Sequence, residues 1–141
     1  MPSRDHIVTS ARSYLGVPWR HQGRSRRGLD CAGLVVRVAR DLGLSDYDTT
    51  NYRRHAHGQA FVDHFRANMD SVPVPEMRPG DVLVFADGAY PCHVGIVAER
   101  YGHPALVHAH ASRRKVVEEA YAGEWPDKVK FGFRFRGLDE A

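Results

Sequence analysis

The stretch Gly28-Leu29-Asp30-Cys31-Ala32-Gly33-Leu34-Val35 joins a basic, polar segment to an apolar run that has helical spacing. Counted from Cys31, the positions that share one face of such a helix are all apolar: Cys31, Leu34, Val35, Val38 and Leu42. Aspartate is a good helix N-cap, and glycine commonly ends a helix. The spacing therefore predicts a helix from Cys31 to Leu42, with Asp30 as its N-cap and Gly43 at its end.

Cys31 would be the first residue of this helix, and that position has chemical consequences. Free backbone N–H groups and the positive end of the helix dipole favour a thiolate there, as in an activated nucleophile. A carboxylate at Asp30 would oppose thiolate formation, so we expect Asp30 to act as a cap rather than as a catalyst. A buried cysteine also packs as a small apolar residue of the core. Position alone leaves both interpretations of Cys31 open.

The chain has 141 residues, a length that suits one domain with its own core, so we expect residues 1–141 to form a single domain. Its formal net charge of +3 goes with basic clusters at residues 24–27, 53–54 and 113–115. Such clusters are usually solvated surface; the alternative is attraction to an anionic polymer, either cell-wall material or nucleic acid. No aromatic residues interleave these arginines, so we expect no nucleic-acid partner.

The chain has two cysteines, Cys31 and Cys92, which are too few for a disulfide framework, although one bridge between them stays an alternative. The first residues, Met1 to His6, lack the apolar segment of a secretory signal. No apolar run reaches the length of a membrane span. We therefore expect a protein that is made in the cytoplasm and that something else must carry to any target outside the cell.

Apolar spacing and turn residues place the other elements. A first helix is expected over residues 4–15 and a third after Gly58, and their apolar faces are Ile7, Val8, Ala11, Tyr14 and Leu15, and Phe61, Val62, Phe65 and Met69. Residues 45–58 are typical of a long loop, and Val72-Pro73-Val74-Pro75 of a linker. Five strands are expected at residues 81–85, 93–98, 105–110, 115–119 and 130–136. Helices followed by an antiparallel meander predict an α+β fold.

A thiolate nucleophile needs a base within hydrogen-bonding reach, and the base needs a group that orients it. His93 opens an apolar strand that can lie beside the start of the cysteine helix. His108 lies in the next expected strand, so an antiparallel pair can bring the two rings together on one face. Alternation puts His110 on the same face as His108, and spacing does not choose between them. His55 and His57 lie in the long loop, where we expect them to be solvated.

Cys92 precedes His93, and in a regular strand the two side chains would point to opposite faces. We therefore expect Cys92 to be a core or edge residue rather than a second active thiol. A zinc site from Cys31, Cys92, His93 and His108 is the metal alternative, but the chain lacks the closely paired ligands of structural zinc sites. We expect neither a metal nor a cofactor.

Four separated motifs give the chain a resemblance to a known family. They are Gly16-Val17-Pro18-Trp19-Arg20 with Gly28–Val35, Arg78-Pro79-Gly80-Asp81-Val82-Leu83-Val84-Phe85, His93-Val94-Gly95-Ile96-Val97, and Val107-His108-Ala109. In order and spacing, over about residues 10–136, they resemble the NlpC/P60 family of cell-wall cysteine peptidases. The segment Arg20-His21-Gln22 and the ending around Val116–Glu118 and Phe133–Phe135 are most similar to members from phage tails and gene-transfer agents.

The resemblance implies a papain-like α+β fold in which N-terminal helices pack on an antiparallel sheet of five or six strands. It implies hydrolysis of an amide bond in peptidoglycan stem peptides, typically the γ-D-glutamyl–diamino acid bond, by a protein of a phage-like particle. Cys31 matches the family's nucleophile, His93 its general base and His108 the residue that orients the imidazole. The backbone N–H of Cys31 and a neighbouring donor would bind the oxyanion.

Some positions depart from the family pattern around the site that we expect Trp19, Asp30 and Ala32 to line. Trp19 stands where many members have a tyrosine, and its indole N–H could donate to the oxyanion instead. Ala32 replaces a serine, so a hydroxyl that contacts substrate is missing, and Gln22–Gly23 replaces a common Gly-Gly pair. These departures leave two alternatives: a thiol amidase or acyltransferase of the same fold, and a non-catalytic part of a tail.

Overall fold

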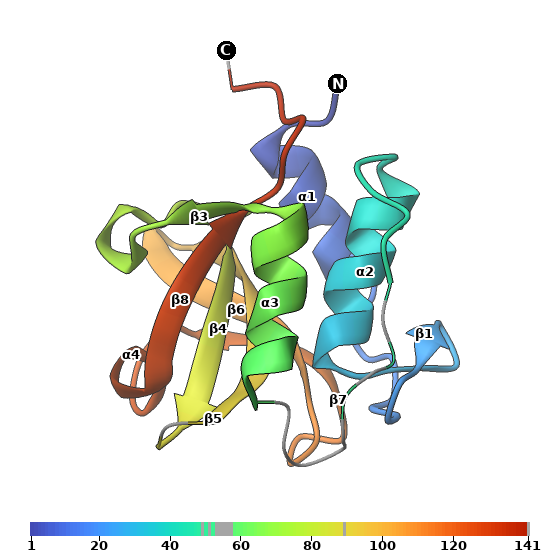
Figure 1. Ribbon diagram of the computed structural model, residues 1–141, viewed down its shortest axis with the longest axis vertical. Helices are drawn as coiled ribbons and strands as arrows, with labels where there is room; N and C mark the ends of the chain where they lie inside the picture. Colours follow the sequence, from blue (N-terminus) through green and yellow to red (C-terminus); the bar gives the residue numbers. More distant parts are fainter. Residues whose placement is uncertain (49, 51, 53–57, 89, 141) are drawn as a thin grey trace.

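The computed structural model of the chain describes residues 1–48, 50, 52, 58–88 and 90–140. The basic pair Arg53–Arg54 and the loop histidines His55 and His57 lie outside these residues. The described part forms helices packed on an antiparallel sheet, which is the expected α+β arrangement (Figure 1). None of the described helices is both long and apolar enough to cross a membrane.

Six strands form one antiparallel sheet in the order β3-β8-β4-β5-β6-β7. Their bounds are β3 Asp70–Val72, β4 Val82–Asp87, β5 Tyr90–Arg100, β6 His103–His110, β7 Lys115–Ala120 and β8 Val129–Arg134. Strands β4 to β7 form the expected meander, but the last strand does not extend it. β8 instead returns to pair with β4 and β3, and its buried Phe133 packs against Phe65, a residue of a helix that covers this face of the sheet, with ring centroids 6.0 Å apart. The simple meander was therefore wrong for this strand.

Three helices lie where the apolar spacing predicts them: α1 Arg4–Arg12, α2 Cys31–Asp41 and α3 Gly58–Asn68. Asp30 is the N-cap of α2, and Gly43 follows its end with a φ of 69°. Helix α1 ends before the expected position, so Leu15 leaves the buried face and is 44% exposed. Helices α2 and α3 run side by side over the sheet (Figure 1).

The expected linker at residues 72–75 is partly regular. Val72 ends the edge strand β3, and Val74–Glu76 forms a 3-10 helix, η1. The prolines fit because β3 pairs on one side only and Pro75 lies in the first turn of η1, where a backbone N–H is not needed. Besides β3 and η1, three other short elements were not expected: β1 Arg24–Ser25, β2 Gly28–Leu29 and α4 Trp125–Lys128.

Alternate strand residues divide between two apolar clusters. The main cluster contains the buried faces of α1, α2 and α3 with strand residues such as Val82, Val84 and Ile96. Their neighbours along the strands pack around Trp125 of α4, in a second cluster of Leu83, Phe85, Val97, Leu106 and Trp125. Both faces of the central strands are therefore buried, and the two faces carry different helices.

Two irregularities occur in β5 near its first residues. The β4–β5 ladder has a β-bulge, because Phe85 opposes His93 while Ala86 opposes Pro91 and leaves Cys92 as the extra residue. The β5–β6 ladder runs from Arg100–His103 to Ile96–Val107, and among the described residues no further pair continues it. The two strands are thus held by backbone pairing at one end only, and the other end lies where α2 begins.

The two ends of the chain meet on the side of the molecule away from the start of α2 (Figure 1). Ser3 forms a β-bridge with Asp139, and the Asp139 N–H donates to the Pro2 carbonyl at 2.7 Å. The Arg4 guanidinium also forms an ion pair with Glu140 at 3.1 Å. The first and last residues therefore stabilise each other.

The buried carboxylate of Asp81 joins several elements at this end of the fold by hydrogen bonds. Asp81 has no exposed surface and accepts hydrogen bonds from Arg4 Nη1 at 2.8 Å, from Arg134 Nε at 2.9 Å and from the Arg78 backbone N–H at 2.8 Å. Burial opposes ionisation of Asp81, but the bonds from Arg134 and Arg4 outweigh it and lower the pKa of the carboxyl group. The charged form of Asp81 therefore ties α1 to β8.

We expect Asp81→Asn to lower the free energy of unfolding by about 2–3 kcal/mol at neutral pH, because two guanidinium groups lose their partner. Since folding lowers the pKa of Asp81, its contribution is present above the ordinary aspartate pKa and is lost as the pH falls through the lowered value. Urea unfolding should therefore show the gap between wild type and variant closing below about pH 4. The control Glu140→Gln removes an exposed partner of Arg4 and should cost less than about 1 kcal/mol. A gap for Asp81→Asn that stays constant with pH would contradict the assignment.

Candidate active site

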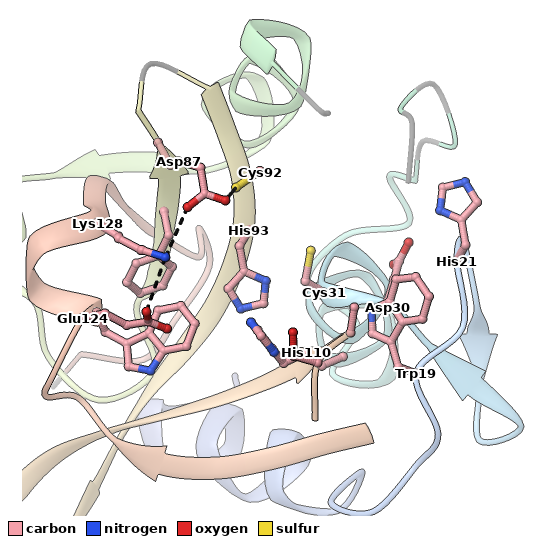
Figure 2. A pocket seen from close by; sticks show the side chains of 16 residues that line it. Trp19, His21, Asp30, Cys31, Asp87, Cys92, His93, His110, Glu124 and Lys128 are labelled. Atoms are coloured by element: carbon pink, nitrogen blue, oxygen red, sulfur yellow. Dashed lines mark hydrogen bonds and ion pairs between the residues drawn. The ribbon is translucent and has the colours of Figure 1, made fainter. Parts of the chain in front are cut away.

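A pocket of about 200 Å³ opens where α2 begins (Figure 2). Cys31 and His93 lie on facing sides of it, so the two residues that the sequence selected are brought together. Trp19, His110 and Trp125 also line the pocket. Its walls therefore come from the cysteine helix, from the sheet and from the short helix α4.

The chain around Cys31 is packed too closely for side chains at two glycines. A Cβ on Gly33 would lie 2.2 Å from the Gly23 carbonyl oxygen, and a Cβ on Gly23 would lie 2.3 Å from the Gly28 carbonyl oxygen. The β1–β2 hairpin therefore lies directly against the first turn of α2 and determines its position. Cys31 is only 5% exposed as a result.

The Asp30 carboxylate beside the thiol is buried, and both of its oxygens are hydrogen-bonded within the chain. One oxygen accepts from the Gly33 N–H at 2.8 Å and from the Arg24 guanidinium at 3.0 Å. The other accepts from the Gln22 N–H at 2.7 Å and from the Tyr52 hydroxyl at 2.6 Å. Asp30 is thus the N-cap that the sequence predicts, and its charge is balanced by Arg24. Although Asp30 lines the pocket, its oxygens hold the helix and the hairpin together.

Burial raises the pKa of the Cys31 thiol, and the negative charge of Asp30 raises it further. The backbone N–H groups of Val94 and Ala32 lower it by hydrogen bonding to the sulfur, but burial and charge outweigh them. The sequence suggested that the start of the helix would lower the thiol pKa. This lowering is smaller than the increase caused by burial and by Asp30. The thiol is protonated at neutral pH, so a base must take its proton before the sulfur can attack a carbonyl group.

His93 belongs to a chain of hydrogen bonds that crosses three neighbouring strands. His93 Nε2 lies 2.7 Å from His108 Nδ1, and His108 Nε2 lies 2.9 Å from Glu119 Oε2. On its other oxygen, Glu119 accepts from the Trp125 indole N–H at 3.1 Å. Because Nε2 of His93 takes part in this chain, Nδ1 is the ring nitrogen that can serve Cys31.

The protonation states along this chain follow from burial and charge. His108 is fully buried, and burial lowers its pKa to about 4 in spite of the nearby carboxylate. Burial works against the ionisation of Glu119, but hydrogen bonds from Trp125 and His108 outweigh it and lower the pKa of Glu119. At neutral pH the pair is therefore a neutral imidazole and a carboxylate.

The geometry shows which of His108 and His110 is placed to orient His93, a choice that spacing alone left open. The ring centroids of His108 and His110 lie 4.9 Å and 5.1 Å from that of His93, so both rings pack against it. The residue hydrogen-bonded to His93 is His108, whereas His110 Nδ1 is buried and has no hydrogen-bond partner among the described residues. His108 is thus the residue placed to orient His93, and His110 forms part of the pocket wall.

Strand alternation predicted that Cys92 and His93 would point to opposite faces of the sheet, and this prediction was wrong. Cys92 is the extra residue of the β-bulge, so Cys92 and His93 both line the pocket. Its thiol is half-buried and lies 3.6 Å from an Asp87 carboxylate oxygen, and both cysteines are free. Among the residues that the structure describes, no three His, Cys, Asp or Glu side chains gather as metal ligands would.

Trp19 and Ala32 occupy different surroundings. Trp19 lines the pocket close to Asp30, as expected (Figure 2). The Ala32 side chain instead lines a small apolar cavity between α2 and α3, and it is almost fully buried. Ala32 affects the thiol through its backbone N–H, which hydrogen-bonds to the Cys31 sulfur and lowers the thiol pKa.

Sequence reasoning missed three residues that support this site: Glu119, Arg24 and Tyr52. Alternation along the strand at residues 115–119 would have put Glu119 on the face that carries His108, two residues from its cross-strand partner, so a signal for it was present. Arg24 was recognised only as part of a basic cluster, and Tyr52 lay in an expected loop. Their contacts with Asp30 depend on how the loops fold back on α2.

A sequence model of the NlpC/P60 family matches residues 16–134 of this chain. The chain is 25% identical over 122 residues to the murein DD-endopeptidase MepS/murein LD-carboxypeptidase of Escherichia coli (strain K12), covering 86% of this chain and 57% of that protein. It is 34% identical over 86 residues to the probable endopeptidase NlpC of the same strain, covering 60% of this chain and 49% of that protein. The chain therefore spans about half the length of these curated relatives.

Solved structures of the same fold exist. A NlpC/P60 family protein from Bacillus cereus ATCC 10987 matches with a TM-score of 0.73, covering 95% of this chain and 40% of that one at 20% identity. At such identity the likeness concerns the fold. It agrees with the helices and the six-stranded antiparallel sheet described above.

We expect Asp30→Asn to make the Cys31 thiol more reactive, because the negative charge that raises its pKa is removed. Asparagine also caps helices, so the bond from the Gly33 N–H can be kept. In a Cys92→Ser background, alkylation by iodoacetamide at pH 8 should become roughly 3- to 10-fold faster.

Asp48→Asn is the matched control for this experiment. Asp48 accepts from the same Arg24 guanidinium at 3.0 Å, but its charge does not influence the thiol pKa noticeably. Its removal should leave the alkylation rate within about twofold of the wild type. A rate for Asp30→Asn that is unchanged or slower would refute the electrostatic role of Asp30.

Proposed function

The chain belongs to the NlpC/P60 family, whose members are peptidoglycan hydrolases, and on that premise we propose that it is a cysteine endopeptidase acting on peptidoglycan stem peptides. The observation that carries the proposal is the position of Cys31 and His93 on facing sides of one pocket, with His93 hydrogen-bonded to His108. A nucleophile, a base and a group that orients the base are the minimal set for thiol-dependent hydrolysis.

The reaction that these residues support has two stages. His93 Nδ1 takes the proton of the Cys31 thiol while the sulfur attacks the amide carbonyl carbon, and the carbonyl oxygen becomes an oxyanion. The C–N bond then breaks, the leaving amine receives the proton from His93, and a thioester to Cys31 remains. Water, deprotonated by His93, hydrolyses the thioester to a carboxylate and regenerates the thiol. The Cys31 backbone N–H and the Trp19 indole N–H are the donors that we propose for the oxyanion.

For the bond that is cleaved, we propose the γ-D-glutamyl–diamino acid amide. The support for this bond is the sequence resemblance alone. The names of the two curated relatives, a murein DD-endopeptidase/LD-carboxypeptidase and a probable endopeptidase, support an endopeptidase in general. A thiol amidase is the second candidate, because Trp19 gives the pocket a bulkier wall than the tyrosine of many members. The masses of the released fragments distinguish the two: an endopeptidase cuts within the stem peptide, and an amidase that acts on the glycan–peptide link frees the whole stem.

We also propose that the protein reaches the cell wall as part of a phage-like particle. The support is the similarity of residues 20–22 and of the ending near Phe133 to family members from phage tails and gene-transfer agents. Mass spectrometry of phage-like particles purified from the organism that encodes the chain tests this idea. Particles that retain wall-degrading activity but contain no peptide of this chain would count against it.

Purified muropeptides test the catalytic proposal directly. We expect wild type to release stem-peptide fragments and Cys31→Ala to lose this activity by about 10³-fold or more, because the nucleophile is removed. Cys92→Ser removes the other sulfur of the same pocket and should keep activity within about fivefold. If wild type and Cys31→Ala release identical fragments at identical rates, the peptidase assignment fails.

A further inference from the structure

Glu119 lies at the far end of the hydrogen-bond chain that begins at His93, and the family resemblance assigns it no role. Each member of the chain comes from a different strand: His93 from β5, His108 from β6 and Glu119 from β7. Glu119 is not among the described residues that line the pocket, and it contacts two residues near it, His108 and Trp125. It is therefore too remote to react, but it contacts the residue that orients the base.

The direction of each hydrogen bond follows from the carboxylate. An ionised carboxylate can only accept, so the proton between Glu119 and His108 lies on His108 Nε2. A neutral imidazole carries one ring proton, so His108 Nδ1 is an acceptor and His93 Nε2 must be the donor to it. In its neutral form, His93 then has its lone pair on Nδ1, the nitrogen that the proposed reaction uses to take the thiol proton.

We propose that Glu119 is a positioning residue that sets the tautomers of His108 and His93 and so makes His93 Nδ1 the base for Cys31. This inference rests on the proposed thiol chemistry. The carboxylate that holds the catalytic histidine of serine proteases in one tautomer has a similar task, but there it contacts the base directly. Here a second imidazole lies between the carboxylate and the base.

The surroundings of Glu119 make its amide counterpart informative. Its Oε1 accepts from the Trp125 indole N–H at 3.1 Å and from Arg113 at 3.4 Å, while Oε2 faces His108. In Glu119→Gln, these donors would hold the amide oxygen on the Trp125 side. The amide NH₂ would then face His108 and donate to Nε2. That reverses the chain: His108 would carry its proton on Nδ1, and His93 would carry its proton on the nitrogen that faces Cys31.

The other charged and titratable groups near this chain are few. His110 packs against both rings from β6, and Arg113 lies in the turn after β6. Glu124 and Lys128, at α4, line the same pocket and pair with each other at 3.5 Å. Glu119→Gln leaves all of these groups in place, so a change in tautomer can be assigned to residue 119.

Ring-nitrogen NMR of the full chain tests the tautomers without any substrate. Two-bond ¹H–¹⁵N spectra at pH 7, assigned with His93→Gln and His108→Gln, should show His93 and His108 protonated on Nε2 in the wild type. In Glu119→Gln, both should be protonated on Nδ1. A wild-type His93 protonated on Nδ1 overturns the proposal, and so do unchanged tautomers in Glu119→Gln. The wild-type spectrum alone is decisive if the variant does not fold.

Alkylation of Cys31 measures the consequence for the nucleophile. In a Cys92→Ser background, Glu119→Gln should react with iodoacetamide about tenfold or more slowly at pH 7, because the base has lost its acceptor nitrogen. Glu118→Gln is the matched control: Glu118 is the preceding residue of β7 and pairs with Arg12 at 2.8 Å, away from the histidines. It should lower stability but keep the alkylation rate within about twofold. Equal rates for Glu119→Gln and wild type would overturn the proposal.

Both measurements are independent of peptidoglycan. Failure of the proposed peptidase activity would appear as absent fragment release with tautomers and thiol reactivity as described. Failure of the Glu119 role would appear as unchanged tautomers and reactivity, whether or not muropeptides are cleaved. The two failures are therefore distinguishable.

Discussion

The early end of the β5–β6 ladder is the constraint on which the rest of the site depends. Backbone pairing stops at Ile96–Val107, and beyond it the two strands are joined by the hydrogen bond between His93 and His108 instead. The Val94 N–H is thereby available to the Cys31 sulfur. Gly95 also leaves room beside these strands, since a Cβ there would lie 2.6 Å from Leu106 Cδ1 and 3.2 Å from His108 Cβ, and these side chains would have to shift. In this part of the sheet, a chain of hydrogen-bonded side chains that begins in the Cys31 pocket therefore takes the place of backbone pairing between β5 and β6.

The start of α2 combines two opposing electrostatic demands. The helix needs a capping acceptor, and Asp30 supplies one, but the same charge makes the neighbouring thiol harder to ionise. Arg24 and Tyr52 satisfy the carboxylate within the protein, at the cost of a connected network that extends from the hairpin to the loop after α2. The resting sulfur remains a thiol, which is a weaker target for oxidants than a thiolate. Reactivity then depends on the histidine opposite.

Much of this architecture could be predicted from local patterns. The three helices, the five main strands and the capping role of Asp30 follow from periodicity and capping preference, because each is determined by nearby residues. The meeting of Cys31 with His93 is a long-range contact, and it was expected from the order of the motifs and the family resemblance. The place of β8 between β3 and β4 and the bulge at Cys92 could not be predicted, and spacing left His108 and His110 open, although the family resemblance selected His108. They depend on which apolar side chains pack together and on where a ladder stops, and these are long-range outcomes. Glu119 lay between the two cases: its face was predictable, but its contact with His108 was not.

The pairing of the chain ends also has a consequence for how the fold can be connected to other protein. Ser3 and Asp139 lie side by side, and Figure 1 shows both ends on the side away from the start of α2, where the pocket opens. A segment attached to either end would leave the molecule there, without crossing the pocket. The fold can therefore act as a module: it can be inserted in a loop of a larger protein, or carried at the tip of one, with the face that holds the Cys31 pocket pointing outward.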